Sequence, residues 1–153
     1  LLKRRDTVRI PWGILVLFGG GIALAVSLEK SNVLQYLAAN AEFLNQWSLV
    51  FIMLVIIVVS LFATELMSNL ALVSVLVPLV AVLAIQMGYD IFQLTIPLTL
   101  AASCAFMMPV STPPNAIVFS SGKVTIAQMA SIGFFLNIIA VLTLWGYCYF
   151  FLA

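Results

Sequence analysis

The sequence predicts an all-α integral membrane protein, and two observations support this prediction. Of its 153 residues, 65% are hydrophobic and 7% are charged, whereas a soluble domain has about 25% charged residues. The apolar residues gather in five long stretches, each near the ~20 residues that a helix needs to cross the bilayer core. Because lipid offers the backbone no hydrogen-bond partners, these stretches are expected to be helices. The lipid bilayer is therefore the predicted environment of the chain.

The charge pattern and the missing residue types exclude several classes of function. The net charge is +1 and the sequence has no histidine. It therefore lacks both the basic surface that nucleic acid requires and the usual general base and metal ligand. Cys104 and Cys148 each lie in an apolar run, where a cysteine is most often a small buried hydrophobic residue. We predict that the chain is not an enzyme and binds no nucleic acid.

The first predicted elements are a transmembrane helix over residues 12–28 and an amphipathic helix over residues 31–45. The first segment is a continuous apolar run. In the second, apolar residues recur at helical spacing between polar ones, which is typical of a helix lying in the membrane interface; an ordinary loop is the alternative. Four basic residues precede the first span, so we expect this end to be cytoplasmic and the C-terminus outside, in the plasma (inner) membrane.

Residues 46–87 contain two apolar stretches that are separated by a short polar segment. Residues 63–70 have neither the charged loop nor the glycine turn expected between water-exposed helix ends. Two interpretations stay open: both stretches cross the membrane, or they form a re-entrant hairpin whose tip, 67–70, stops within it. Non-helical backbone at that depth must be packed in protein or line a cavity. Glu65 has three open roles: a local pairing, a position facing an aqueous cavity, or a contribution to cation binding.

The segment 91–122 is too long for a single transmembrane helix. As one helix it would measure about 48 Å, against a hydrocarbon core of ~30 Å. It is interrupted by Pro109, Pro113 and Pro114, and proline removes an amide donor and clashes with the preceding turn. We therefore predict a broken helix that is unwound across 109–115. A last transmembrane helix is predicted over 124–152.

Breaks in helices within a membrane expose backbone groups that bind ions. Free amides at a helix N-terminus attract anions, and free carbonyls at a C-terminus attract Na⁺. Such a site needs no charged side chain, which would be costly at mid-membrane. The neutral polar side chains near the two predicted breaks are Ser68, Asn69, Ser111, Thr112 and Asn115. The pattern predicts a transporter; a structural membrane subunit without a solute site is the competing hypothesis.

Three segments of the chain resemble the divalent anion:sodium symporter family. Residues 12–25 resemble the span that precedes a hairpin in that family, and Ser68-Asn69 resembles the Ser-Asn-Thr tip of its second hairpin. Residues 101–119, which read AASCAFMMPVSTPPNAIVF, are the strongest match. The order of the segments is also that of the family. One position departs from it: Leu70 stands where the family has Thr, which removes a hydroxyl donor to the anion.

The resemblance implies a fold and a mechanism. The family's transporters are homodimers that carry dicarboxylates, citrate or sulfate, usually with Na⁺. Each subunit has two inverted repeats, each with a re-entrant helical hairpin and a broken transmembrane helix, and moves its substrate by an elevator-like motion. This chain would be most of the second inverted repeat of an elevator-type transporter. It would act together with a missing N-terminal repeat of the same protein.

The resemblance also implies binding residues. The residues that would bind Na⁺, the coupling ion, partly by backbone carbonyls, are Thr64, Met67, Asn69 and Ser111. The residues that would hold a substrate carboxylate or lie close to it are Ser68, Asn69, Thr112 and Pro113. We expect a symporter that moves small divalent anions such as C4-dicarboxylates with Na⁺. A Na⁺-independent anion exchanger, and sulfate or citrate as the substrate, are the alternatives.

Overall fold

The computed structural model describes residues 47–152 continuously, together with scattered positions between residues 16 and 31. Most of the helix predicted over 12–28, and all but the first residue of the helix predicted over 31–45, therefore lie outside the described residues. From residue 47 onward the regular elements are all helices, which confirms the all-α prediction. They are α4 (Leu49–Thr64), α5 (Asn69–Gln86), α6 (Ile91–Ala102), α7 (Pro113–Ser120) and α8 (Ile126–Phe151).

Each of these helices begins at a polar side chain that caps it. The capping oxygen accepts a hydrogen bond from an amide in the first turn, where the helix has no partner of its own. Two of the caps are complete capping boxes, in which the third helical residue is a glutamine that binds back to the capping residue. The capping residues are Ser48, Ser68, Asp90, Thr112 and Thr125.

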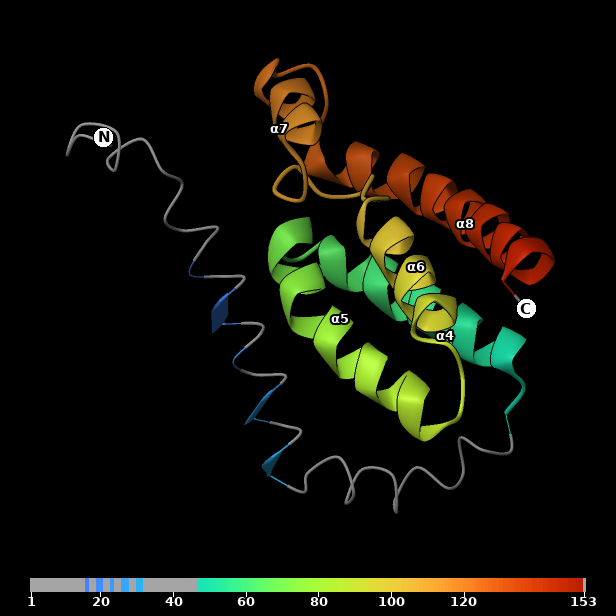
Figure 1. The fold of residues 1–153 in the computed structure, drawn as a ribbon. Helices are drawn as coiled ribbons and strands as arrows, with labels where there is room; N and C mark the ends of the chain where they lie inside the picture. Colours follow the sequence, from blue (N-terminus) through green and yellow to red (C-terminus); the bar gives the residue numbers. More distant parts are fainter. Residues whose placement is uncertain are drawn as a thin grey trace, which may run out of the picture.

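Helix α6 is the central element of the bundle (Figure 1). It packs against both α4 and α5, while α4 and α5 contact each other far less. At the ends of α4 and α6, the Thr64 hydroxyl lies 3.0 Å from the Ala102 carbonyl oxygen. Near the beginnings of the same helices, Ile52 and Leu94 line one hollow. Helices α4 and α6 therefore run parallel, and α5, which follows α4 in the sequence, runs in the opposite direction. The apolar core between these helices includes Met53, Ile57, Leu61, Leu94, Leu98 and Ala101.

Helix α8 runs antiparallel to α4. Near the beginning of α4, the indole Nε1 of Trp145 donates to the Val50 carbonyl at 2.9 Å. Just beyond the end of α4, Nδ2 of Asn137 donates to Oε1 of Glu65 at 2.9 Å. The order of the two contacts along α8 is the reverse of their order along α4. This arrangement brings the first half of α8 to the end of the bundle where α4 and α6 stop (Figure 1).

The interruption of the 91–122 segment lies at a different place from the predicted one. The non-helical residues are 103–112, here called the α6–α7 loop, instead of 109–115. Pro113 occupies the first position of α7, where a missing amide costs no helical hydrogen bond. Pro113 and Pro114 therefore begin α7, and the break lies before them, from residue 103 to residue 112.

The connection between α4 and α5 also differs slightly from the prediction. It consists of residues 65–68, here called the α4–α5 loop. Asn69 and Leu70, which belonged to the predicted tip 67–70, already lie in the first turn of α5. The cause is the Ser68 side chain, which caps α5 by accepting a hydrogen bond from the amide of Ala71.

Candidate functional site

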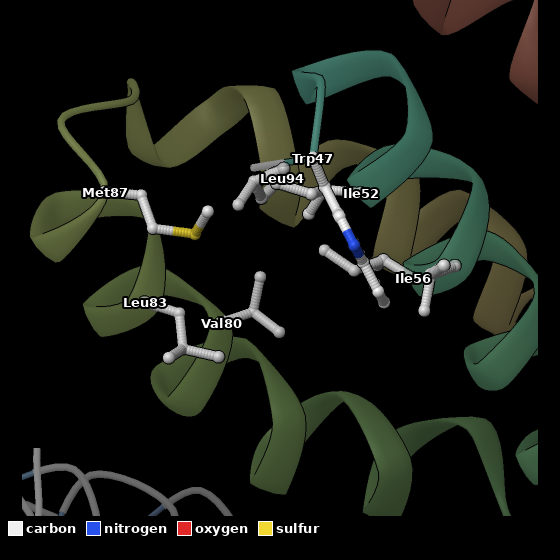
Figure 2. A pocket seen from close by; sticks show the side chains of 8 residues that line it. Trp47, Ile52, Ile56, Val80, Leu83, Met87 and Leu94 are labelled. Atoms are coloured by element: carbon white, nitrogen blue, oxygen red, sulfur yellow. The ribbon is translucent and has the colours of Figure 1, made fainter. Parts of the chain in front are cut away.

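An apolar hollow between the described helices is a poor candidate for binding an anion. It has a volume of about 180 Å³ and lies between α4, α5 and α6, at the end of the hairpin away from the α4–α5 loop (Figure 2). Apolar and aromatic side chains line it, including Trp47, Val80 and Met87. A charged ligand placed there would lose its hydration without gaining hydrogen bonds. The polar groups gather at the opposite end of the bundle.

The α4–α5 loop and the α6–α7 loop meet at that end. Because α4 and α6 run parallel, both helices stop at the same level, and α5 and α7 begin there (Figure 1). Side-chain contacts of Thr64 and Glu65 join the two loops. Two helix C-termini and two helix N-termini therefore converge, which places carbonyl-rich and amide-rich regions next to each other.

Thr64 is fully buried and lies within a group of oxygen atoms. Its Oγ1 is 2.6 Å from Oδ1 of Asn69 and 3.0 Å from the carbonyl oxygen of Ala102. A hydroxyl has one proton and donates to only one of these acceptors, which leaves the other without that hydrogen. Ala102 is the last residue of α6, where the helix dipole is negative. Oxygen atoms in this arrangement suit a hard cation.

Glu65 is buried and its carboxylate holds the backbone of the α6–α7 loop. Oε1 accepts hydrogen bonds from the amides of Phe106, at 2.8 Å, and Met107, at 3.0 Å. Oε2 accepts from the amide of Met108 at 3.0 Å, and Asn137 donates to Oε1 as described above. Hydrogen bonds of this kind offset the hydration that a buried carboxylate loses. Of the three roles left open for Glu65, the structure therefore supports the local pairing.

Asn115 of α7 holds the same loop from its other side. Its Nδ2 lies 3.0 Å from the Ala105 carbonyl, 3.1 Å from the Met108 carbonyl and 3.2 Å from Oγ of Ser111. Ser111 is buried, and its hydroxyl donates to the Met108 carbonyl at 2.6 Å. Glu65 thus binds the amide of Met108 while Ser111 and Asn115 bind its carbonyl. The loop is defined by hydrogen bonds although it has no regular structure.

The beginning of α5 leaves two backbone amides free. The carbonyl of Ser68 accepts from the amide of Leu72 at 3.0 Å, and its hydroxyl accepts from the amide of Ala71 at 3.3 Å. Within residues 47–152 the amides of Asn69 and Leu70 have no hydrogen-bond partner. Ser68 and Leu70 are exposed and Asn69 is half-buried. This helix end can therefore donate to a carboxylate.

The beginning of α7 offers no such donors. Pro113 and Pro114 have no amide hydrogen. The amide of Asn115 is bound by Oγ1 of Thr112 at 3.4 Å, and that of Ala116 by the Thr112 carbonyl at 3.1 Å. Of the residues predicted to lie near the substrate, Thr112 can therefore contribute its hydroxyl hydrogen, and Pro113 can contribute only apolar contact.

The structure brings together some of the predicted cation ligands and not others. Thr64 and Asn69 are in direct contact. Ser111 is joined to them only indirectly, through Met108 and Glu65. Met67 lies in the α4–α5 loop and its side chain is exposed. The predicted set therefore divides into a direct pair and two residues that could contribute through the backbone.

Sequence reasoning missed two groups at this site. The first is the carbonyl oxygen of Ala102, for which no side chain gives a signal. The second is Asn137 of α8, which is fully buried against Glu65. The available signal was an amide side chain within a long apolar helix, because such a side chain usually hydrogen-bonds to a neighbouring helix.

Comparison with known proteins identifies the family. Residues 3–151 match the family described as the sodium:sulfate symporter transmembrane region. The sodium-dependent dicarboxylate transporter SdcS of Staphylococcus saprophyticus is 41% identical over 135 residues. The transporter of the same name from Staphylococcus aureus is 42% identical over 133 residues. These alignments cover 88% and 87% of this chain but 26% of each relative, so the chain spans about a quarter of the length of these relatives.

The match confirms the resemblance to the divalent anion:sodium symporter family, and it confirms the prediction that the chain is not an enzyme, since the matched proteins are transporters. The described helices agree with a place in the membrane: α5 and α8 are long and apolar enough to cross it. The chain belongs to the sodium:sulfate symporter family of integral membrane transport proteins.

Proposed function

We propose that this chain is the second inverted repeat of a symporter that moves small divalent anions, such as C4-dicarboxylates, together with Na⁺. One observation carries the proposal: the oxygen group around Thr64 lies next to the free amides at the beginning of α5, and Asn69 belongs to both. The first suits a cation and the second an anion. The relatives named sodium-dependent dicarboxylate transporter support the same pair of solutes.

The proposed Na⁺ ligands are the side chains of Thr64 and Asn69 and the carbonyl of Ala102, with backbone contributions near Met67 and Ser111. The side-chain amide of Asn69 has two orientations. Turned over, it would donate to Thr64 and satisfy the local groups without an ion. In the other orientation its oxygen accepts from the Thr64 hydroxyl, and this oxygen would also be available to a cation.

The same amide explains how Na⁺ binding promotes anion binding. With its oxygen turned toward the ion, Asn69 directs its Nδ2 donor away from Thr64. The ion also lowers the cost of bringing a carboxylate to the free amides of Asn69 and Leu70, because the two charges attract each other. Na⁺ and the anion thus favour the same state of the hairpin, which is the thermodynamic condition for coupling.

The lengths of α4 and α6, the two helices that end at the site, support a position of both loops within the membrane. With 16 and 12 residues, α4 and α6 are about 24 and 18 Å long, which is short of the ~30 Å hydrocarbon core. The two loops would then lie near mid-membrane, around a cavity shared with an N-terminal repeat. In this proposal the protein is a homodimer of the plasma (inner) membrane that works by an elevator-like motion, with the N-terminal end of this chain cytoplasmic and its C-terminus outside.

The experiment is uptake of labelled succinate by the full-length protein in proteoliposomes, with Na⁺ or choline outside. Na⁺-dependent uptake is expected, and Asn69→Ala is expected to abolish it. Gln86→Ala is the matched control, since Gln86 is an exposed amide at the other end of α5. Undiminished uptake by Asn69→Ala would contradict the site. Equal uptake in choline would contradict Na⁺ coupling and favour an anion exchanger.

A further inference from the structure

The α6–α7 loop passes directly over a glycine of α8. A Cβ atom on Gly133 would lie 2.4 Å from the carbonyl oxygen of Phe106 and 2.6 Å from Cα of Met107. Real side chains do not approach backbone so closely, so the loop could keep this place only if residue 133 has no side chain. Gly133 is helical and buried, and its role is to leave room for the loop.

Asn137 lies one turn further along α8, on the same face. Its Nδ2 donates to the Glu65 oxygen that also accepts the amides of Phe106 and Met107. Its own Oδ1 is buried without a hydrogen-bond partner, which is costly for a carbonyl oxygen. In this orientation the Asn137 side chain donates a hydrogen bond to Glu65, and its own oxygen is left without a donor. We call Glu65, Gly133 and Asn137 the loop anchor.

The loop anchor changes which groups are free at the end of α6. If α6 continued, the amide of Phe106 would bind the carbonyl of Ala102, four residues earlier. Residues 103–108 contain neither proline nor glycine, so nothing in their own sequence forbids this. Instead Glu65 binds the amide of Phe106, and the Ala102 carbonyl faces the hydroxyl of Thr64. The carboxylate of Glu65 therefore keeps the Ala102 carbonyl, a proposed Na⁺ ligand, out of a helical hydrogen bond.

We propose that Glu65, held by Asn137 and by the space above Gly133, is a positioning residue that sets the affinity for Na⁺. It prevents α6 from extending over the cation site, and it does so without touching the ion. This inference rests on the Na⁺-coupled function proposed above. It assigns the three residues of the loop anchor a role in ion affinity that differs from that of direct ligands.

The test compares Na⁺ dependence with maximal uptake in the full-length transporter in proteoliposomes. Glu65→Gln keeps one oxygen that can accept the amides of Phe106 and Met107, but its NH₂ group would face the amide hydrogen of Met108. It should therefore hold the loop less firmly than the carboxylate does. The Na⁺ concentration for half-maximal uptake is expected to rise about 10–100-fold, as for other partners outside the first ligand shell. Maximal uptake at saturating Na⁺, per reconstituted protein, should change far less. Reduced maximal uptake with an unchanged Na⁺ dependence would overturn the proposal.

A glycine pair supplies a second variant with a matched control. Gly133→Ala should raise the half-maximal Na⁺ concentration, because the added methyl group displaces the loop. Gly146→Ala on the same helix should not, since a Cβ there has no neighbour within 4 Å. Both changes favour helix formation equally. The proposal is wrong if the two variants have the same Na⁺ dependence. If Glu65→Gln does not accumulate, this pair decides alone.

Displacement of the loop can be measured directly at Cys104, which lies in the loop and is half-buried. With the other cysteines of the full-length protein replaced, Glu65→Gln and Gly133→Ala should speed alkylation of Cys104, and Gly146→Ala should not. Unchanged alkylation in the first two variants would contradict the anchoring role. Suppose that Glu65→Gln has the Na⁺ dependence of the wild type while Asn69→Ala still abolishes uptake. That result would overturn the role of Glu65 but leave the proposed function standing. If Asn69→Ala also transports normally, the proposed function fails as well.

Discussion

Glu65 and Phe106 are 41 positions apart in sequence, yet the carboxylate of one accepts the backbone amide of the other at 2.8 Å. The contact joins the loop between α4 and α5 to the loop between α6 and α7. Both loops carry proposed site residues, and this hydrogen bond fixes one loop against the other. The predictions below separate groups that bind a solute from groups that hold the loops.

Replacing Thr64 should weaken Na⁺ binding. Thr64→Val keeps the shape of the side chain but removes the oxygen that lies against Asn69 and Ala102. The half-maximal Na⁺ concentration for uptake should rise by about tenfold, the equivalent of ~1.4 kcal/mol. Thr143→Val is the control, because Thr143 is exposed on α8 and its hydroxyl binds only the Ile139 carbonyl. An unchanged Na⁺ dependence in Thr64→Val would remove Thr64 from the ligand set.

Restoring the family's hydroxyl at residue 70 should strengthen anion binding. Leu70 is 49% exposed beside the two free amides at the beginning of α5. Leu70→Thr adds a donor there, and one further hydrogen bond of about 1 kcal/mol should lower the KM for succinate roughly fivefold. Leu70→Val has the same branched shape without the hydroxyl and should not show this gain. Equal KM values for the two variants would show that residue 70 does not contact the substrate.

Asn115 should matter for stability. Asn115→Ala removes the donor shared by the carbonyls of Ala105 and Met108. The Met108 carbonyl keeps the Ser111 hydroxyl, but the buried Ala105 carbonyl is left unpaired, which should cost about 1–3 kcal/mol. Thermal unfolding of the full-length protein in detergent should therefore begin at a lower temperature. Ser120→Ala, an exposed position on the same helix, should have little effect. Equal unfolding temperatures would contradict the anchoring of the loop by Asn115.

Trp145 should affect stability without changing solute binding. Trp145→Phe removes the indole donor to the Val50 carbonyl, at the end of the bundle away from the two loops. We expect a loss of about 1 kcal/mol in stability with an unchanged half-maximal Na⁺ concentration. Thermal unfolding and uptake measured on the same preparation check both statements. A change in Na⁺ dependence would mean that packing at this end of the bundle reaches the proposed site.

The sequence was informative where a local rule applies. Low charge and long apolar stretches predicted helices because lipid provides no partners for the backbone. Ser68 was recognised beside the hairpin connection, and Ser111, Thr112 and Pro113 beside the break. The exact limits of the break were not predictable from the prolines, because Pro113 and Pro114 are as favourable at a helix start as they are unfavourable in its interior.

The sequence by itself determined the helical class of this protein, its affinity for the membrane and the two regions where helices must be interrupted, because these follow from composition and from residues close together in the chain. Only the tertiary structure decided that α6 ends at Ala102, that Glu65 binds the amides of the α6–α7 loop, and that Gly133 and Asn137 support this contact. Their partners lie tens of residues away: backbone amides for Glu65, the loop backbone for Gly133 and the Glu65 carboxylate for Asn137. Which amide reaches which oxygen depends on the packing of α4, α6 and α8, and no local pattern encodes it.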